Sequence, residues 1–220
     1  MDKQTSNPSS YKVRGQIRRL NKFSKNANYM EKEIFNFHVQ DLSFGWCRVV
    51  MLINGNEIHY NASYLGQNPL ASFIDACEDL YNEEGTYYVG WQAEPGMLDI
   101  TLDLKDNNQL HIDIIDKYGD IINGEWHEII PFEAFASAIV SEGFRVLNTY
   151  GLYGYQCSWS DHTEFPLSNL LHITAIIQKK TIGDTYISDI AKEIEFLQQN
   201  LPKLKIEQET KISIITREME

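Results

Sequence analysis

The sequence predicts an α+β fold: an antiparallel meander sheet of about six to eight strands, with helices packed on one face and a helical C-terminal part. Hydrophobic and polar residues alternate through residues 98–104 and again through 110–114, which is typical of strands with one buried and one solvated face. Residues 69–82 and 132–148 instead carry apolar side chains at helical spacing, so a helix at each position can cover such a sheet.

The N-terminal half begins with three predicted strands. Residues 35–39 alternate, residues 45–53 form a denser apolar run, and residues 57–64 return to alternation. The last two stretches are separated by Asn54-Gly55, a pair that tolerates the positive φ angles of a tight hairpin turn. Three consecutive antiparallel strands are therefore expected to form a meander.

A helix is predicted to follow these strands. Asn68 and Pro69 are typical of a helix start, because a capping side chain precedes a residue that needs no amide donor, and Gly85 is expected to end the helix. Cys77 lies on the apolar stripe, so we interpret it as a core thiol. The next strands are predicted at residues 87–91, 98–104, 110–114 and 126–130, with turns at 94–96 and 106–108 and a loop at 118–125.

Proline and glycine residues set the predicted boundaries in the C-terminal half, because proline fits the first turn of a helix and glycine favours its end. In chain order we predict a helix from Pro131 to Gly151, an irregular stretch over 151–165, a helix over 167–178, a helix between Gly183 and Pro202, and a strand over 205–215.

The distribution of charge divides the chain. Residues 1–30 hold seven basic side chains and one acidic side chain for a net charge of +6, whereas the remaining residues carry −18. We predict a basic, partly disordered N-terminal arm over 1–30 and an α+β core domain over 31–182. A C-terminal helix and strand over 183–220 are expected to pack on the core or on a partner. The arm is either neutralised by the acidic body or a nucleic-acid arm, and its shortage of aromatic neighbours disfavours the second role.

The composition excludes several classes of protein. A net charge of −12 at pH 7 makes general nucleic-acid binding unfavourable. No apolar run approaches the roughly 18 to 20 residues that a membrane-spanning helix needs. Three cysteines at unrelated spacings predict reduced thiols, and the first residues show no apolar stretch of a signal peptide. We therefore expect a cytoplasmic protein.

The sequence offers little support for catalysis. The six histidines show no metal-binding spacing, and no nucleophile elbow or phosphate-binding glycine motif is present, so no metal and no cofactor are predicted. One set of residues remains as a candidate catalytic site: Cys157, His162 and Glu164. Cys157 stands in a stretch predicted to be irregular and glycine-flanked, where a thiol can be accessible to a nearby histidine.

A second candidate site is aromatic and acidic. Tyr153, Tyr155 and Trp159 crowd one stretch beside Asp161 and Glu164. Tyrosine and tryptophan supply large contact areas at interfaces, and the neighbouring carboxylates suit a basic protein partner. The alternative is that these rings plug the core.

Two motifs carry a resemblance to a known group. The stretch Tyr60-Asn61-Ala62-Ser63-Tyr64-Leu65-Gly66 precedes Asn68-Pro69-Leu70, and Trp91-Gln92-Ala93-Glu94-Pro95-Gly96 follows the predicted helix. This outline resembles a loose group of uncharacterised bacterial α+β proteins, over roughly residues 34–172. The group has no established activity, so the resemblance implies no catalytic residues. By analogy of fold and charge, small acidic proteins of this sort occur among immunity proteins of bacterial toxin systems.

The last predicted helix carries a narrow apolar seam, formed by Ile187, Ile190, Ile194, Leu197 and Leu201. A seam of this width suits one partner helix better than a broad sheet face. The partner is either the 167–178 helix of the same chain or the 184–201 helix of a second copy. In the second case the chain forms a homodimer through that helix.

Together these observations favour a non-catalytic protein-binding module that presents an acidic aromatic surface to a basic protein. An immunity-type inhibitor is the most specific form of this hypothesis. The alternative is a hydrolase or transferase of unfamiliar type that uses Cys157, His162 and Glu164.

Overall fold

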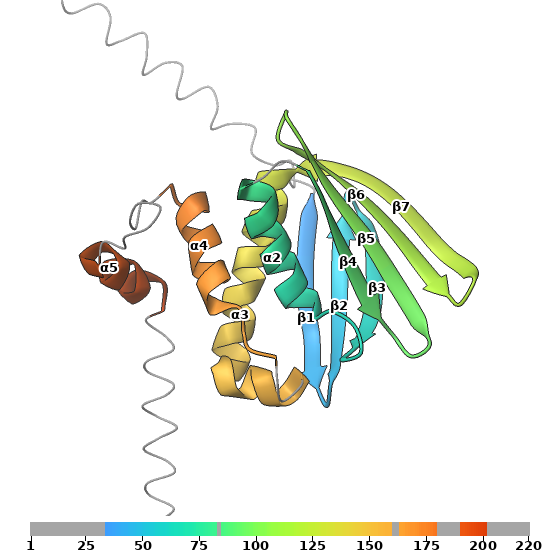
Figure 1. Ribbon diagram of the computed structural model, residues 1–220, viewed down its shortest axis with the longest axis horizontal. Helices are drawn as coiled ribbons and strands as arrows, with labels where there is room; N and C mark the ends of the chain where they lie inside the picture. The colour runs from blue at the N-terminus through green and yellow to red at the C-terminus, as the bar shows by residue number, and fades with distance from the viewer. Residues whose placement is uncertain (1–33, 83–84, 160–162, 180–189, 202–220) are drawn as a thin grey trace, which may run out of the picture. The chain divides into compact units, whose positions relative to one another are not determined.

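The computed structural model describes residues 34–82, 85–159, 163–179 and 190–201, all of which belong to the unit Glu33–Glu220. The predicted arm over 1–30 and the predicted strand over 205–215 lie outside the described residues. The described residues form seven strands and four helices (Figure 1). In chain order these are β1 (Phe35–Ser43), β2 (Trp46–Ile53), β3 (Asn56–Ser63), α2 (Pro69–Asn82), β4 (Thr86–Gln92), β5 (Gly96–Lys105), β6 (Gln109–Tyr118), β7 (Ile121–Pro131), α3 (Phe132–Trp159), α4 (Leu167–Ile177) and α5 (Ile190–Asn200).

The α+β class and the antiparallel pairing are confirmed, but the single sheet is wrong. The strands form two antiparallel sheets, β1-β2-β3 and β4-β5-β6-β7. At the start of the second sheet the loop between β3 and α2 occupies the edge of β4: Gln67 N donates to Gly90 O at 3.2 Å, and Gly90 N donates to Gln67 Oε1 at 2.7 Å. β3 instead reaches β4 through a side chain, because the Tyr60 hydroxyl donates to Trp91 O at 3.0 Å.

The predicted turn and helix start are present. Asn54 and Gly55 adopt φ angles of 50° and 91° between β2 and β3, as a two-residue hairpin turn requires. Asn68 Oδ1 accepts a hydrogen bond from Ala71 N at 3.0 Å, which caps α2 and satisfies one of the free amides at its start. Local side-chain chemistry therefore sets both features.

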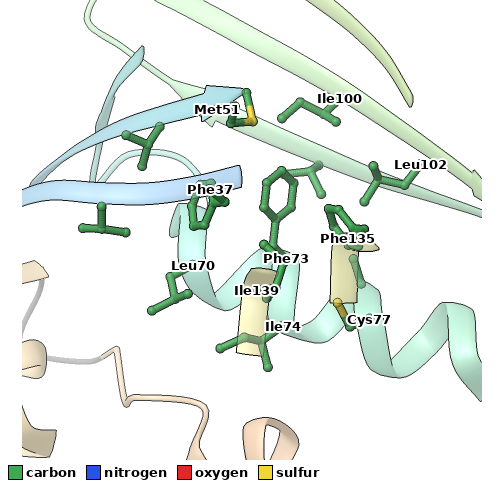
Figure 2. Packing of buried hydrophobic residues seen from close by; sticks show 14 of the residues in the cluster. Phe37, Met51, Leu70, Phe73, Ile74, Cys77, Ile100, Leu102, Phe135 and Ile139 are labelled. Carbon is green, nitrogen blue, oxygen red and sulfur yellow. The ribbon is translucent and has the colours of Figure 1, made fainter. Parts of the chain in front are cut away.

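The hydrophobic core joins both sheets to α2 and α3, and its centre is Phe73 of α2 (Figure 2). The Phe73 ring centroid lies 4.9 Å from that of Trp91, 5.1 Å from that of Phe37 and 5.3 Å from that of Phe135. One ring thus contacts β4, β1 and α3 together. The indole of the fully buried Trp91 donates to Ser72 Oγ at 3.0 Å, so its polar atom is satisfied inside the core.

Helix α3 extends further than the sequence predicts. Gly151 breaks the regular helix with φ of 66°, as expected, but residues 152–159 resume a helical course where an irregular stretch was predicted. The resumed turns bury Tyr155 and Trp159, one helical turn apart, on the inner side. This short segment has glycines at 151 and 154, so its local propensity for helix is weak and tertiary packing stabilises it.

The outer edge of β1 is closed by two side chains of α3. Register along β1 shifts between Val39 and Asp41, and Val39 N donates to Glu142 Oε1 at 2.5 Å. Val39 O accepts from Arg145 Nη2 at 2.5 Å, and Arg145 Nε donates to Glu142 Oε2 at 2.7 Å. Glu142 is only 5% exposed, and its hydrogen bonds raise the pKa of Arg145 above the ordinary value. Both backbone groups of Val39 are therefore satisfied although none of the described strands lies on that side of β1.

Replacing Phe73 tests its central place in the core. We expect Phe73→Ala to lower the free energy of unfolding by about 3–5 kcal/mol, because a cavity opens between both sheets and α3. Tyr81→Ala on the same helix is the control, since Tyr81 is exposed and its loss should cost under about 1 kcal/mol. Urea unfolding followed by circular dichroism measures both, and similar losses for the two variants would contradict the assignment.

Glu142→Ala tests the closure of the β1 edge. We expect a loss of about 2–4 kcal/mol, because the substitution removes the acceptor of Val39 N and of Arg145 Nε and leaves the charge of Arg145 without its carboxylate. Ser141→Ala, at the neighbouring exposed position, should stay within about 0.5 kcal/mol of the parent protein. Thermal and urea unfolding give the comparison, and an unchanged stability in Glu142→Ala would show that the edge needs no acceptor there.

Candidate functional site

A surface pocket of about 870 Å³ lies where residues 152–159 of α3, the segment before α4, α4 itself and α5 meet. We call it the α3–α4–α5 pocket. Its wall is mostly apolar and includes Leu152, Phe165, Leu167, Leu171 and Leu197. The break at Gly151 lets the chain place residues 152–156 on one wall, and Leu197 brings α5 to the other.

Two residues of the predicted partner-binding set share this pocket. Tyr153 is 80% exposed and Glu164 is exposed, and both line the wall. Glu164 is the one acidic side chain among the described residues that line the pocket, and that lining includes no lysine or arginine. An exposed tyrosine and an exposed carboxylate thus line the same space.

Two other members of that set are buried, which corrects the prediction for them. Tyr155 is 1% exposed and Trp159 is 3% exposed, so neither can contact a partner on this surface. The Tyr155 ring packs edge-on against Phe165 with centroids 5.1 Å apart, and burial raises the pKa of its hydroxyl well above the ordinary value. Tyr155 and Trp159 are four residues apart, which places both on one face of a helix. This spacing indicates their shared burial only if the segment is taken as helical, whereas the sequence predicted an irregular stretch. Asp161, the remaining member, lies outside the described residues.

The candidate catalytic set is not assembled within the described part of the chain. Cys157 is exposed, but it is absent from the lining of the pocket that Glu164 lines, and no hydrogen bond between these two described side chains is present. His162 lies outside the described residues. Cys47 and Cys77 are buried, and burial raises the pKa of each thiol far above its ordinary value, so both stay protonated at neutral pH.

Some histidines pair with acidic residues of other elements, whereas His59 Nε2 lies 2.6 Å from Oε1 of Glu57 on its own strand. His127 Nδ1 lies 2.7 Å from Asp113 Oδ1 on the exposed face of β6 and β7, and this hydrogen bond raises the pKa of His127. His172 Nδ1 lies 3.0 Å from Glu78 Oε1. Among the described residues, no group of three or more histidine, cysteine, aspartate or glutamate side chains is placed to hold a metal ion.

The predicted self-association seam is only partly described, and its contact face differs from the prediction. Ile187 lies outside the described residues, and α5 begins at Ile190. Ile194 is 49% exposed, whereas Phe196 is buried and Leu197 lines the pocket. The face that α5 buries therefore includes Phe196, which the seam omitted, whereas Ile194 of the seam stays half exposed. Asn200 Oδ1 accepts from Gln178 Nε2 at 3.2 Å, which ties α5 to the end of α4 in the same chain.

An exposed apolar tip, which no sequence pattern indicates, is formed by Phe44 in the β1–β2 turn with Tyr64 and Leu65, which follow β3. Phe44 is 95% exposed and adopts a φ of 51°, a left-handed conformation that is unfavourable for a bulky residue. Tyr64 N donates to Gly45 O at 2.7 Å, and Gly45 N donates to Ser158 O at 2.9 Å. The tip is therefore fastened to the end of α3.

Comparison with known proteins finds no matching family model, curated protein or solved structure. None of the helices in the described ranges has the length and apolarity to cross a bilayer.

Cysteine alkylation tests the catalytic alternative. We expect iodoacetamide at neutral pH to modify the native protein at Cys157 alone, at a rate no faster than that of a small free thiol, while Cys47 and Cys77 react only after unfolding. Mass spectrometry of the native and unfolded protein measures this, with Cys157→Ser as the control. Labelling of Cys157 much faster than a free thiol, and slowed by His162→Ala, would instead favour the hydrolase or transferase hypothesis.

Proposed function

We propose that this protein is a non-catalytic binding module for a basic protein partner and that the α3–α4–α5 pocket is its contact site. The observation that carries the proposal is the exposure of Tyr153 and Glu164 in one apolar-walled pocket whose lining holds no basic side chain.

The chemistry of the pocket suits a lysine or arginine side chain. The aliphatic stem of such a residue can lie along Leu152 and Leu167 while its charged head meets the Glu164 carboxylate. Tyr153 supplies a large contact area at a small cost in side-chain entropy. The net charge of −12 adds a long-range attraction for basic proteins, which speeds association at low salt.

The β1–β2 tip supports a role in binding as a second contact. A left-handed conformation costs a non-glycine residue about 1–2 kcal/mol, and the equivalent turn between β2 and β3 avoids most of this cost by using Asn54. Because the Phe44 side chain is exposed, its packing in the free protein cannot offset the cost of the left-handed backbone conformation. Contact of the ring with a partner would offset the strain.

The most specific form of the proposal is an immunity-type inhibitor. It rests on the acidic charge and on the resemblance of the Tyr64-Leu65-Gly66 and Glu94-Pro95-Gly96 segments to a loose bacterial group. In this form the partner is a toxin encoded beside the gene of this protein, and binding suppresses the toxin.

Co-expression with the products of the neighbouring genes tests the proposal. We expect one basic neighbour to co-purify and to have its toxicity suppressed, and we expect Tyr153→Ala combined with Glu164→Lys to weaken that complex about 100-fold, as the loss of an aromatic and a charged contact predicts. Tyr88→Ala combined with Glu57→Lys, which changes the same residue types at exposed positions of β4 and β3, should change the affinity less than about threefold.

Calorimetric titration of the purified complex supplies the affinities. If no neighbouring gene product binds, the immunity form is wrong. If one binds equally well to both double variants, the pocket is not the contact site.

A further inference from the structure

The chain closes the edges of its sheets with specific groups. Unpaired backbone groups at a sheet edge invite another strand, so proteins usually cover or blunt them. Here Glu142 and Arg145 satisfy Val39 on β1, and Gln67 satisfies Gly90 on β4. The second sheet has one further edge, formed by β7 (Figure 1).

The backbone directions along β7 follow from two hydrogen bonds. Phe132 N, just after β7, donates to Asn108 O on the β6 side, whereas Ile129 O accepts from Asn54 Nδ2 at 3.3 Å. Because successive residues of a strand point their backbone groups to opposite sides, Glu125, His127 and Ile129 direct theirs away from β6. The described residues supply a partner to Ile129 through Asn54 and show no backbone partner for Glu125 and His127 on that side.

The protection of this open stretch is incomplete: Glu125 and Glu128 are charged and a bulge falls at Asn123, but within the described residues no other strand or helix covers Glu125 and His127. No lysine or proline stands between Gly124 and Glu128, and Pro131, which lacks an amide donor, blunts only the far end of the strand. The Trp126 ring lies over Gly124, where any β-carbon would approach the ring to 2.5 Å. The absence of a side chain at Gly124 therefore leaves room for the Trp126 ring to lie along the strand.

We propose that β7 pairs antiparallel with β7 of a second copy of this chain, about a two-fold axis at Trp126, so that two four-stranded sheets become one of eight strands. This inference is independent of the proposed partner site.

The strand that pairs with β7 is identified by the complementarity of β7 to a second copy of itself. With the axis at Trp126, Glu125 of each copy lies opposite His127 of the other, and the outward backbone groups of these residues form four hydrogen bonds. The two Glu–His pairs are opposite in charge when His127 is protonated and hydrogen-bonded when it is neutral, and both favour pairing. The two Trp126 side chains meet at the closely spaced, non-hydrogen-bonded position, where aromatic pairs add stability. A strand from another protein would need to supply all three matches.

A proline substitution tests the pairing without disturbing β6. His127→Pro removes an amide that points away from β6, so the β6–β7 ladder keeps its hydrogen bonds while pairing with a second copy is blocked. We expect sedimentation velocity over a concentration series to show a monomer–dimer equilibrium for the parent protein and a monomer for His127→Pro. Circular dichroism checks that the fold is retained.

A charge-swap series keeps the inference testable if the proline variant fails to fold. At a pH low enough to protonate His127, Glu125→Lys places like charges across both pairs and should weaken the dimer about tenfold, whereas Glu125→Lys combined with His127→Glu restores complementarity and should recover it. A parent protein that stays monomeric at the highest concentration overturns the inference. So does a dimer that survives these β7 variants and is lost instead in Ile194→Asp on α5.

Discussion

The packing of Phe73 against Trp91 holds the structure together. Phe73 comes from the helix that connects the two sheets, and Trp91 comes from the first strand of the second sheet, with ring centroids 4.9 Å apart. The same Phe73 ring contacts Phe37 of β1 and Phe135 of α3. Two sheets that share no backbone ladder are thus joined through side chains, and the packing of these large rings stabilises their contact.

The division into two sheets leaves strands such as β1 at a sheet edge, and other elements cover the backbone groups that these edge strands expose. Helix α3 lies along β1 and presents the buried Glu142 with Arg145 to the backbone of Val39. This arrangement solves a solvation problem, because a backbone amide and carbonyl under a helix cannot reach water. It also fixes α3 along its length, so that residues 152–159 reach the β1–β2 tip and one wall of the α3–α4–α5 pocket.

The position of the α3–α4–α5 pocket depends on this packing. Gly151 interrupts α3, and the resumed turns send Tyr155 and Trp159 inward to anchor the segment. Tyr153, on the opposite side of the same turns, is left exposed in the pocket. One short segment therefore supplies both the core contact that positions the pocket and the ring that faces solvent there.

The sequence by itself determined the features that depend on neighbouring residues: the strand alternation, the Asn54-Gly55 turn, the capped start of α2 and the break at Gly151. These follow from φ preferences, side-chain caps and periodicity, which act within a few residues. Only the tertiary structure decided that seven strands form two sheets, that Tyr155 is buried beside an exposed Tyr153, and that Phe196 rather than Ile194 faces the body. Each of these outcomes depends on contacts between residues far apart in the chain, and no local pattern carries that information.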